Sequence, residues 1–171
     1  MTTKAEFDAQ EWQTVLEGPA LAGMIVVTAQ RGGTIRESVA MAKVYVEAQK
    51  EHAGVDLLAE IATKPPQLEA REFKSAEQLR TEGLERIRNA VAILEPKATA
   101  EEVDAYKRFA LTVAERAAEA DKSGGFLGVG GERVSDTESA ALDELASTLG
   151  IERQAPSTSP AEQEPQEPPA E

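Results

Sequence analysis

Helix-start signals recur along this chain and constrain its fold more than any other feature. Each signal is a short oxygen-bearing side chain followed three positions later by Glu or Gln. There are five such pairs: Asp8 and Glu11, Thr34 and Glu37, Ser75 and Gln78, Thr99 and Glu102, and Ser135 and Glu138. A pair of this kind satisfies two backbone N–H groups at a helix N-terminus. The pattern predicts an all-α fold, and no segment reads convincingly as a strand.

The stop signals between these starts predict seven helices. Gly18 ends the first helix, Pro19 suits the first position of the second, and Gly32-Gly33 ends the second. The helices are expected to span residues 8–18, 19–32, 34–50, 55–62, 75–95, 99–121 and 135–149. Gly83 lies inside the fifth helix, which indicates a close helix contact or a bend.

The composition favours one tightly packed bundle with a tail. With one Trp, two Tyr and four Phe, the core must consist mainly of Ala, Leu, Val and Ile. Residues 154–171 contain five prolines, four glutamates and no large apolar residue, so they cannot bury enough surface to offset their chain entropy. We therefore expect a flexible N-terminus over residues 1–6, a helical domain over 7–151, and a disordered acidic Pro-rich tail over 152–171.

The net charge of −13 and the absence of cysteine exclude several classes of function. Phosphate binding needs clustered Lys and Arg, so free nucleic acid and anionic membrane surfaces are unlikely partners. Disulfides, thiolate nucleophiles and Cys-type metal sites are excluded outright. No signal-peptide pattern appears, and the longest apolar run, residues 20–29, is too short to span a bilayer. A soluble cytoplasmic protein is expected.

Two glycine-containing helix junctions share one plan. Residues 29–37 read Ala-x-x-Gly-Gly-x-x-x-Glu, and residues 120–138 repeat this plan with a glycine-rich insertion. The repeat predicts pseudo-duplicated halves. The pattern resembles the tellurite-resistance TerB-like superfamily over about residues 7–151, and a group of uncharacterised bacterial proteins. The resemblance implies a seven-helix domain with acidic turns and a role as a stress-response, metal-linked adaptor near membranes. The first turn, residues 30–33, lacks the acidic residues of that family.

The second junction offers a candidate site for a divalent cation. Asp121, Ser123 and Glu132 occupy positions 1, 3 and 12 of a calcium-type loop, but Gly125 and Phe126 stand at positions 5 and 6. The EF-hand pattern requires an oxygen ligand and a glycine there, respectively. The acidic set that remains is Asp121, Glu132, Asp136 and Glu138. The alternative interpretation is a flexible loop whose glycines satisfy turn geometry.

Three apolar residues in the same loop suggest a different role. Phe126, Leu127 and Val129 can fold back over the core or form a docking patch for a partner. The leading hypothesis is therefore a non-enzymatic interaction or scaffold protein that needs no cofactor, with a protein as its partner. A cation sensor that uses residues 121–138 is the alternative.

A third hypothesis is a small enzyme that uses carboxylates on its helices. Glu101, Glu102 and Asp104 recur at helical spacing, as do Glu115 and Glu119, and two carboxylates on one face can act as acid and base. A solvated charged face is the simpler interpretation. The lone His52 suits a helix C-terminus, where the dipole favours a cation. Trp12 and Tyr106 are expected in the core.

Overall fold

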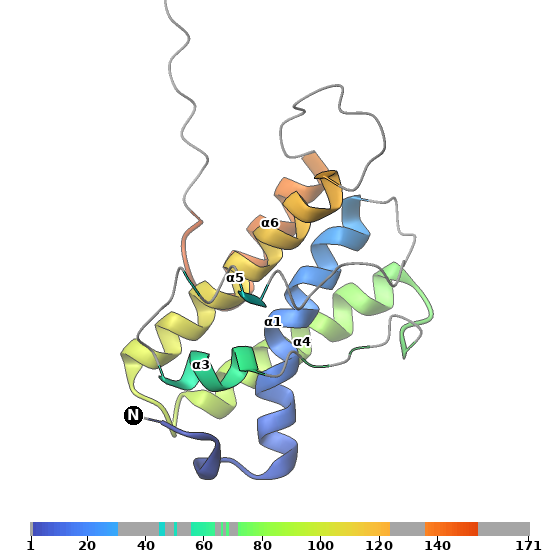
Figure 1. Ribbon diagram of the computed structural model, residues 1–171. Helices are drawn as coiled ribbons and strands as arrows, with labels where there is room; N and C mark the ends of the chain where they lie inside the picture. The colour runs from blue at the N-terminus through green and yellow to red at the C-terminus, as the bar shows by residue number, and fades with distance from the viewer. Residues whose placement is uncertain are drawn as a thin grey trace, which may run out of the picture.

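The computed structural model describes residues 2–30, 45–46, 50, 56–63, 66, 68, 72–123 and 136–153, and the side chains of 30 and 120–123 are outside this description. Within these ranges the fold is all-α, as predicted, with no strand (Figure 1). A short 3₁₀ turn, η1 (Lys4–Glu6), precedes α1 (Ala9–Gln30), α3 (Asp56–Thr63), α4 (Ala76–Leu94), α5 (Ala100–Ser123) and α6 (Asp136–Leu149). Most of the helix expected over 34–50, and the tail beyond Arg153, lie outside the described residues.

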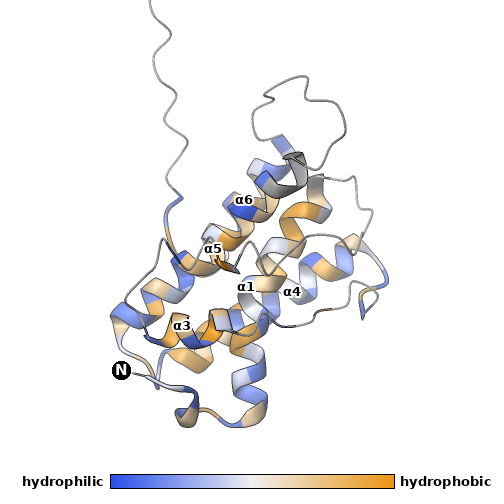
Figure 2. Ribbon diagram, viewed as in Figure 1, coloured by the Kyte–Doolittle hydropathy of each residue, from blue (hydrophilic) through white to orange (hydrophobic). Residues whose placement is uncertain are grey.

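Helix α1 is the central element of the bundle. It packs against α4, α5 and α6, while α3 packs on α5. Its second half is buried on nearly every side, and Leu21, Ala22 and Val26 have no exposed surface. Figure 2 shows apolar residues along this helix where the other helices cover it. The segment expected to form a helix after Pro19 is therefore the buried second half of α1.

The expected break at Gly18-Pro19 is wrong, because one continuous helix passes through both residues. A proline inside a helix has no N–H to donate to the carbonyl four residues earlier, which here belongs to Val15. The Tyr106 hydroxyl of α5 donates a 2.8 Å hydrogen bond to that Val15 oxygen. A Cβ at Gly18 would lie 2.1 Å from the same hydroxyl, so glycine makes room for the tyrosine. The tertiary contact replaces the bond that Pro19 removes, and the helix continues.

The helix starts follow the predicted capping chemistry. The Asp8 carboxylate accepts from the Glu11 N–H at 2.8 Å, and Glu11 accepts in turn from the Asp8 N–H at 2.9 Å. The rings of Phe7 and Trp12 lie 5.5 Å apart, as expected of a hydrophobic staple. At α4, Ser75 accepts from the Gln78 N–H at 3.1 Å. These local signals therefore set the starts of α1 and α4.

Glu102 completes a third capping box and also holds the N-terminal segment. Its carboxylate accepts from the Thr99 N–H at 3.0 Å, from the Thr2 N–H at 2.7 Å and from the Thr2 hydroxyl at 2.8 Å. The expectation of a solvated carboxylate is wrong for Glu102, which is 9% exposed. Burial alone would raise its pKa, but these hydrogen bonds outweigh burial and lower the pKa to about 2. Thr2, in the N-terminal segment before α1, is held here.

Gly83 marks the closest approach of α1 and α4. A Cβ at this position would lie 2.9 Å from Cδ1 of Ile25. The close helix contact expected from a glycine inside a helix is therefore confirmed. Because the neighbouring atom is the end of a flexible side chain, the contact restricts the size of residue 83 less severely than Tyr106 restricts residue 18.

Gly150 ends α6 with a complete C-terminal motif. The Ile151 N–H donates to the Ala146 carbonyl at 3.1 Å, and the Gly150 N–H donates to the Ser147 carbonyl at 3.2 Å. Gly150 has φ +67°, and nothing lies within 4 Å of where a Cβ would stand. The chain then reverses, and Arg153 donates to the Ser139 hydroxyl and the Asp143 carboxylate, each at 3.1 Å.

Replacing Gly150 with alanine should lower the free energy of unfolding by about 1 kcal/mol, because only the backbone conformation is penalised. Urea unfolding followed by circular dichroism measures the change. Gly150→Asn is the matched control, since asparagine tolerates the left-handed region better, and it should lose less. Equal losses in the two variants would contradict this account of the motif.

Candidate functional site

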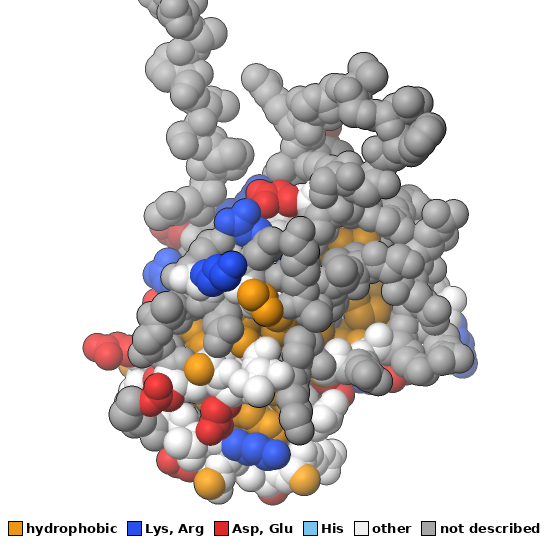
Figure 3. Space-filling view, viewed as in Figure 1, with side chains coloured by type: hydrophobic (Ala, Val, Ile, Leu, Met, Phe, Trp, Pro, Cys, Tyr) orange, Lys and Arg blue, Asp and Glu red, His pale blue; other side chains and the backbone are white. Residues whose placement is uncertain are grey.

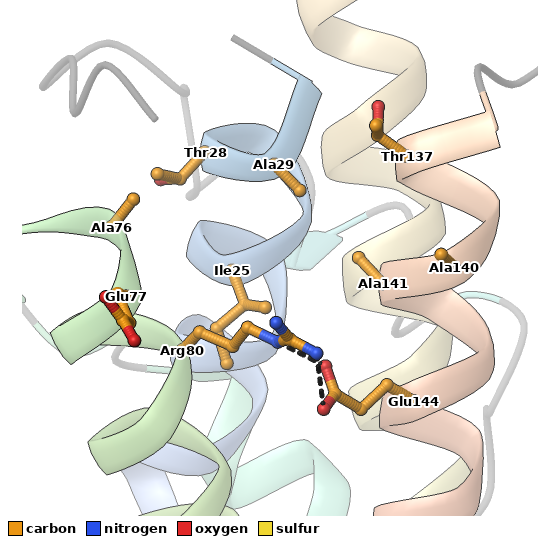
Figure 4. A pocket seen from close by; sticks show the side chains of 10 residues that line it. All are labelled: Ile25, Thr28, Ala29, Ala76, Glu77, Arg80, Thr137, Ala140, Ala141 and Glu144. Carbon is orange, nitrogen blue, oxygen red and sulfur yellow. Dashed lines mark hydrogen bonds and ion pairs between the residues drawn. The ribbon is translucent and has the colours of Figure 1, made fainter. Parts of the chain in front are cut away.

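A cavity lined by described residues lies where α1, α4 and α6 meet. It has a volume of about 540 Å³ and sits between the last turns of α1, the first turns of α4 and the first half of α6 (Figure 4). Ten described residues line it: Ile25, Thr28, Ala29, Ala76, Glu77, Arg80, Thr137, Ala140, Ala141 and Glu144. Cavities of about 300–1,000 Å³ are the usual size for ligand sites. We call this cavity the α1/α4/α6 pocket.

Small side chains keep the pocket open. Alanines line it from all three helices, at positions 29, 76, 140 and 141, and Ile25 is the only large apolar side chain among the described lining residues. Elsewhere in the core, alanines pack together with larger Leu, Ile, Val and aromatic side chains. A gap remains here because alanine cannot reach across the space between α4 and α6.

An ion pair joins α4 to α6 at the edge of the pocket. Arg80 Nε lies 2.6 Å from Glu144 Oε2, and Arg80 Nη2 lies 2.9 Å from Glu144 Oε1. Figure 4 shows the two side chains pointing toward one another between the helices. The carboxylate raises the pKa of Arg80. Because the Arg80 side chain is 62% exposed, the pair contributes at most about 1 kcal/mol to stability and is free to exchange partners.

The remaining polar groups of the lining are two threonines and one carboxylate. Thr28 is buried, whereas Thr137 and Glu77 are exposed. The described lining therefore offers an apolar floor, two hydroxyl groups and a charged rim. This is the chemistry of a binding surface, because polar groups in small number orient a ligand that apolar contacts hold.

The second cavity, of about 400 Å³, lies at the opposite end of α5. Its lining includes Glu95, Asp104 and Lys107 together with Gly150 and Ile151 of the α6 terminus. Charged side chains make up more of this lining than of the α1/α4/α6 pocket. It offers less apolar contact to a ligand, so we take the α1/α4/α6 pocket as the candidate site.

The structure describes only part of the predicted cation site. Asp136 is exposed at the start of α6, and Glu138 is fully buried two residues later. Asp121 belongs to the last turn of α5, but its side chain is outside the described atoms, and Glu132 lies outside the described residues altogether. Among the described side chains, no three acidic or imidazole groups lie close enough together to hold a metal ion. The four-residue cation site stays a prediction.

The remaining candidate residues lie either outside the described part of the chain or in the core. Phe126, Leu127, Val129 and His52 lie outside the described residues. Tyr106 is fully buried, and Trp12 is 7% exposed, so both belong to the core as expected.

The carboxylates considered for acid–base chemistry lie beside arginines. Glu119 lies 2.9 Å from Arg116 Nη1, and Glu115 lies 3.8 Å from Arg153 Nε. Each of the two therefore lies in an ion pair with an arginine on the helix surface. The enzyme hypothesis gains no support from these two residues.

Sequence reasoning missed the pocket because its parts are far apart in the chain. Arg80 and Glu144 are separated by 64 positions. Each is a charged residue on an amphipathic helix, which looks like any solvated position when read alone. The only local signal is alanine at half-exposed position 76 of α4 and at exposed position 140 of α6, where longer polar side chains are common.

The charge around the described surface is predominantly acidic. Figure 3 shows Asp and Glu side chains gathered around α3 and the beginning of α5 on this face. With 31 acidic and 18 basic side chains, the whole chain attracts cationic partners at a distance. In the described part of the chain, no helix combines the length and the apolar character needed to cross a bilayer.

Comparison with protein-family models, with curated proteins and with solved structures returned no match for this chain.

Proposed function

We propose that this chain is a non-enzymatic interaction protein that binds a partner through the α1/α4/α6 pocket. The observation that carries the proposal is the pocket itself, a cavity of about 540 Å³ that three helices line largely with alanines and Ile25. Filling this space with one or two longer side chains would have stabilised the bundle. An open apolar pocket with a polar rim is the usual form of a binding site.

The fold-level part of the proposal follows the TerB-like resemblance. We propose a bundle with pseudo-duplicated halves that includes the helix over 34–50, and a role in a bacterial stress response in the cytoplasm. The described helices are compatible with this arrangement although α1 joins two of the expected helices. An experimental structure that places residues 31–44 and 124–135 tests the duplication, because the two halves must then superpose on each other.

The binding role is tested by filling the pocket. Ala140 is exposed on α6 and lines the pocket, so Ala140→Phe should occupy the space without disturbing the core. Ala59→Phe on exposed Ala59 of α3 is the matched control. Wild type and both variants are immobilised and incubated with lysate from the source organism, and captured proteins are quantified by mass spectrometry. Proteins captured by wild type and by Ala59→Phe should fall about tenfold with Ala140→Phe.

Two results would overturn the proposal. One is a set of captured proteins that Ala140→Phe retains as well as the control does. The other is the absence of any protein enriched over empty beads. Urea unfolding of each bait establishes that it is folded, and Ala140→Leu provides a smaller filling variant if Phe lowers stability.

A further inference from the structure

Among the described residues, the rim of the α1/α4/α6 pocket carries more negative than positive charge. Glu77 and Glu144 contribute two carboxylates, and Arg80 contributes one guanidinium that Glu144 already holds at 2.6 and 2.9 Å. Asp136, exposed one residue before Thr137 of the lining, adds a further carboxylate on the α6 side. A cation at this rim can therefore pair with Glu77, and it can compete with Arg80 for the Glu144 carboxylate. An anion can pair with Arg80 only if it displaces Glu144.

The walls of the pocket suit a helical segment. Two helices, α4 and α6, flank the space, and α1 forms its floor (Figure 4). Alanines on both flanking helices allow another backbone to approach closely, and Ile25 on the floor offers apolar contact. Amphipathic helices bind grooves of this kind through aliphatic side chains at i, i+3, i+4 and i+7.

We propose that the occupant is a basic amphipathic helix of a partner protein, with an aliphatic stripe in the pocket and Lys or Arg side chains beside Glu77 and Glu144. This inference rests on the proposed function and names the chemistry of the partner. Charge complementarity selects a basic helix over an acidic or neutral one, because the local rim and the whole chain, at −13, both repel an acidic helix. Arg80 turns toward solvent when a partner cation takes its place on Glu144.

The probe is a fluorescein-labelled peptide of about four helical turns made of Leu, Ala and Lys, with leucines at i, i+3, i+4 and i+7. A second peptide has Glu in place of each Lys. Fluorescence anisotropy with the full chain measures both Kd values at low and at physiological salt. We expect the Lys peptide to bind at least about tenfold more tightly than the Glu peptide, and its affinity to fall as salt rises.

Substitutions separate specific docking from general attraction to an acidic protein. Glu77→Gln should weaken the Lys peptide about three- to tenfold at low salt. Glu101→Gln, at an exposed position in the first turn of α5, makes the same change in net charge and should alter Kd less than about twofold, because Glu101 lies away from the pocket. Ala140→Phe should weaken the peptide about tenfold or more by filling the groove.

The inference is overturned if the Glu peptide binds as tightly as the Lys peptide, or if Glu77→Gln and Glu101→Gln weaken binding equally. Binding that Ala140→Phe leaves unchanged also overturns it. These failures are distinct from failure of the binding role. Capture from lysate that depends on the pocket, combined with no preference for the Lys peptide, rejects the basic helix and leaves the binding role standing.

Discussion

Replacing Gly18 with alanine is expected to lower the free energy of unfolding by about 3 kcal/mol, in spite of the higher helix propensity of alanine. The new Cβ would stand 2.1 Å from the Tyr106 hydroxyl oxygen, in the fully buried contact between α1 and α5. Tyr106 must move, and its movement breaks the bond to the Val15 carbonyl. The variant therefore suffers both crowding and a buried carbonyl without a donor. Urea unfolding at neutral pH measures the change.

A double variant identifies the tyrosine hydroxyl as the cause. Tyr106→Phe alone should cost about 1–3 kcal/mol, because Val15 loses its donor. In Gly18→Ala/Tyr106→Phe the atom at 2.1 Å is gone, and the nearest remaining neighbour is the ring carbon at 3.3 Å. The double variant should therefore be more stable than Gly18→Ala alone, with a coupling of at least about 1 kcal/mol. Losses that simply add would show that the hydroxyl and the glycine act independently.

Pro19→Ala provides a further control on the same contact. The alanine restores an N–H opposite the Val15 carbonyl, so Tyr106→Phe should be less damaging in this background than in the wild type. Should Tyr106→Phe cost the same with and without Pro19, the tyrosine would be important for packing and not for replacing the missing bond.

The second large effect is expected at Glu102. Glu102→Gln keeps the shape of the side chain but replaces one of the two accepting oxygens by an NH₂ donor, which cannot accept from Thr2 or Thr99. A fall of the carboxyl pKa from 4.5 to about 2 corresponds to about 3 kcal/mol at 1.36 kcal/mol per unit. We expect the variant to lose about 2–3 kcal/mol at pH 7, measured by urea unfolding.

The lowered pKa of Glu102 determines how the free energy of unfolding should change with pH. The folded pKa of Glu102 lies below the ordinary value, so its ionised form stabilises the fold above about pH 4.5, and this contribution is lost as pH falls toward 2. Glu102→Gln has no such contribution to lose. The stability difference between wild type and variant should therefore shrink between pH 4.5 and 2. A difference that stays constant over this interval would contradict the role of the carboxylate.

Subtracting the variant from the wild type isolates Glu102 from other carboxylates. Glu11 also has a lowered pKa, chiefly because Lys97 donates to it. Since Glu11 is present in both proteins, its contribution cancels in the difference. Thr2→Ala offers an independent check, because it removes the hydroxyl that Glu102 binds at 2.8 Å but leaves the helix cap in place.

The sequence predicts the features of this fold that depend on neighbours in the chain. The caps at Asp8, Ser75 and Thr99, and the stop at Gly150, involve residues within a few positions of each other, and all four were found from the sequence. The continuity of α1 through Pro19 was not predicted, because it depends on the Tyr106 hydroxyl, which is 91 positions from Val15 in the chain. The burial of Glu102 depends on Thr2, which is 100 positions away. Local pattern reasoning has no access to such pairs.

The candidate site was unpredictable for the same reason. The ion pair between Arg80 and Glu144, and the pocket beside it, can be recognised only when α4 and α6 are placed on either side of α1. The sequence directed attention to the glycine-rich segment at 124–131 and to its acidic neighbours, where residues are unusual in type. The pocket is instead made of ordinary residues, mostly alanines, in an unusual arrangement.

The central position of α1 has a consequence for biosynthesis. This helix leaves the ribosome before α4, α5 and α6, which pack against it. They follow at least 46 positions later, since α1 ends at Gln30 and α4 begins at Ala76. The part of the α1 surface that packs against α4 stays without that partner until synthesis has passed Leu94, and the Thr2 contact must wait for Glu102. Folding of this chain is therefore expected to be late and concerted, and nascent chains that end before α4 should be recognised by chaperones that bind exposed apolar helices.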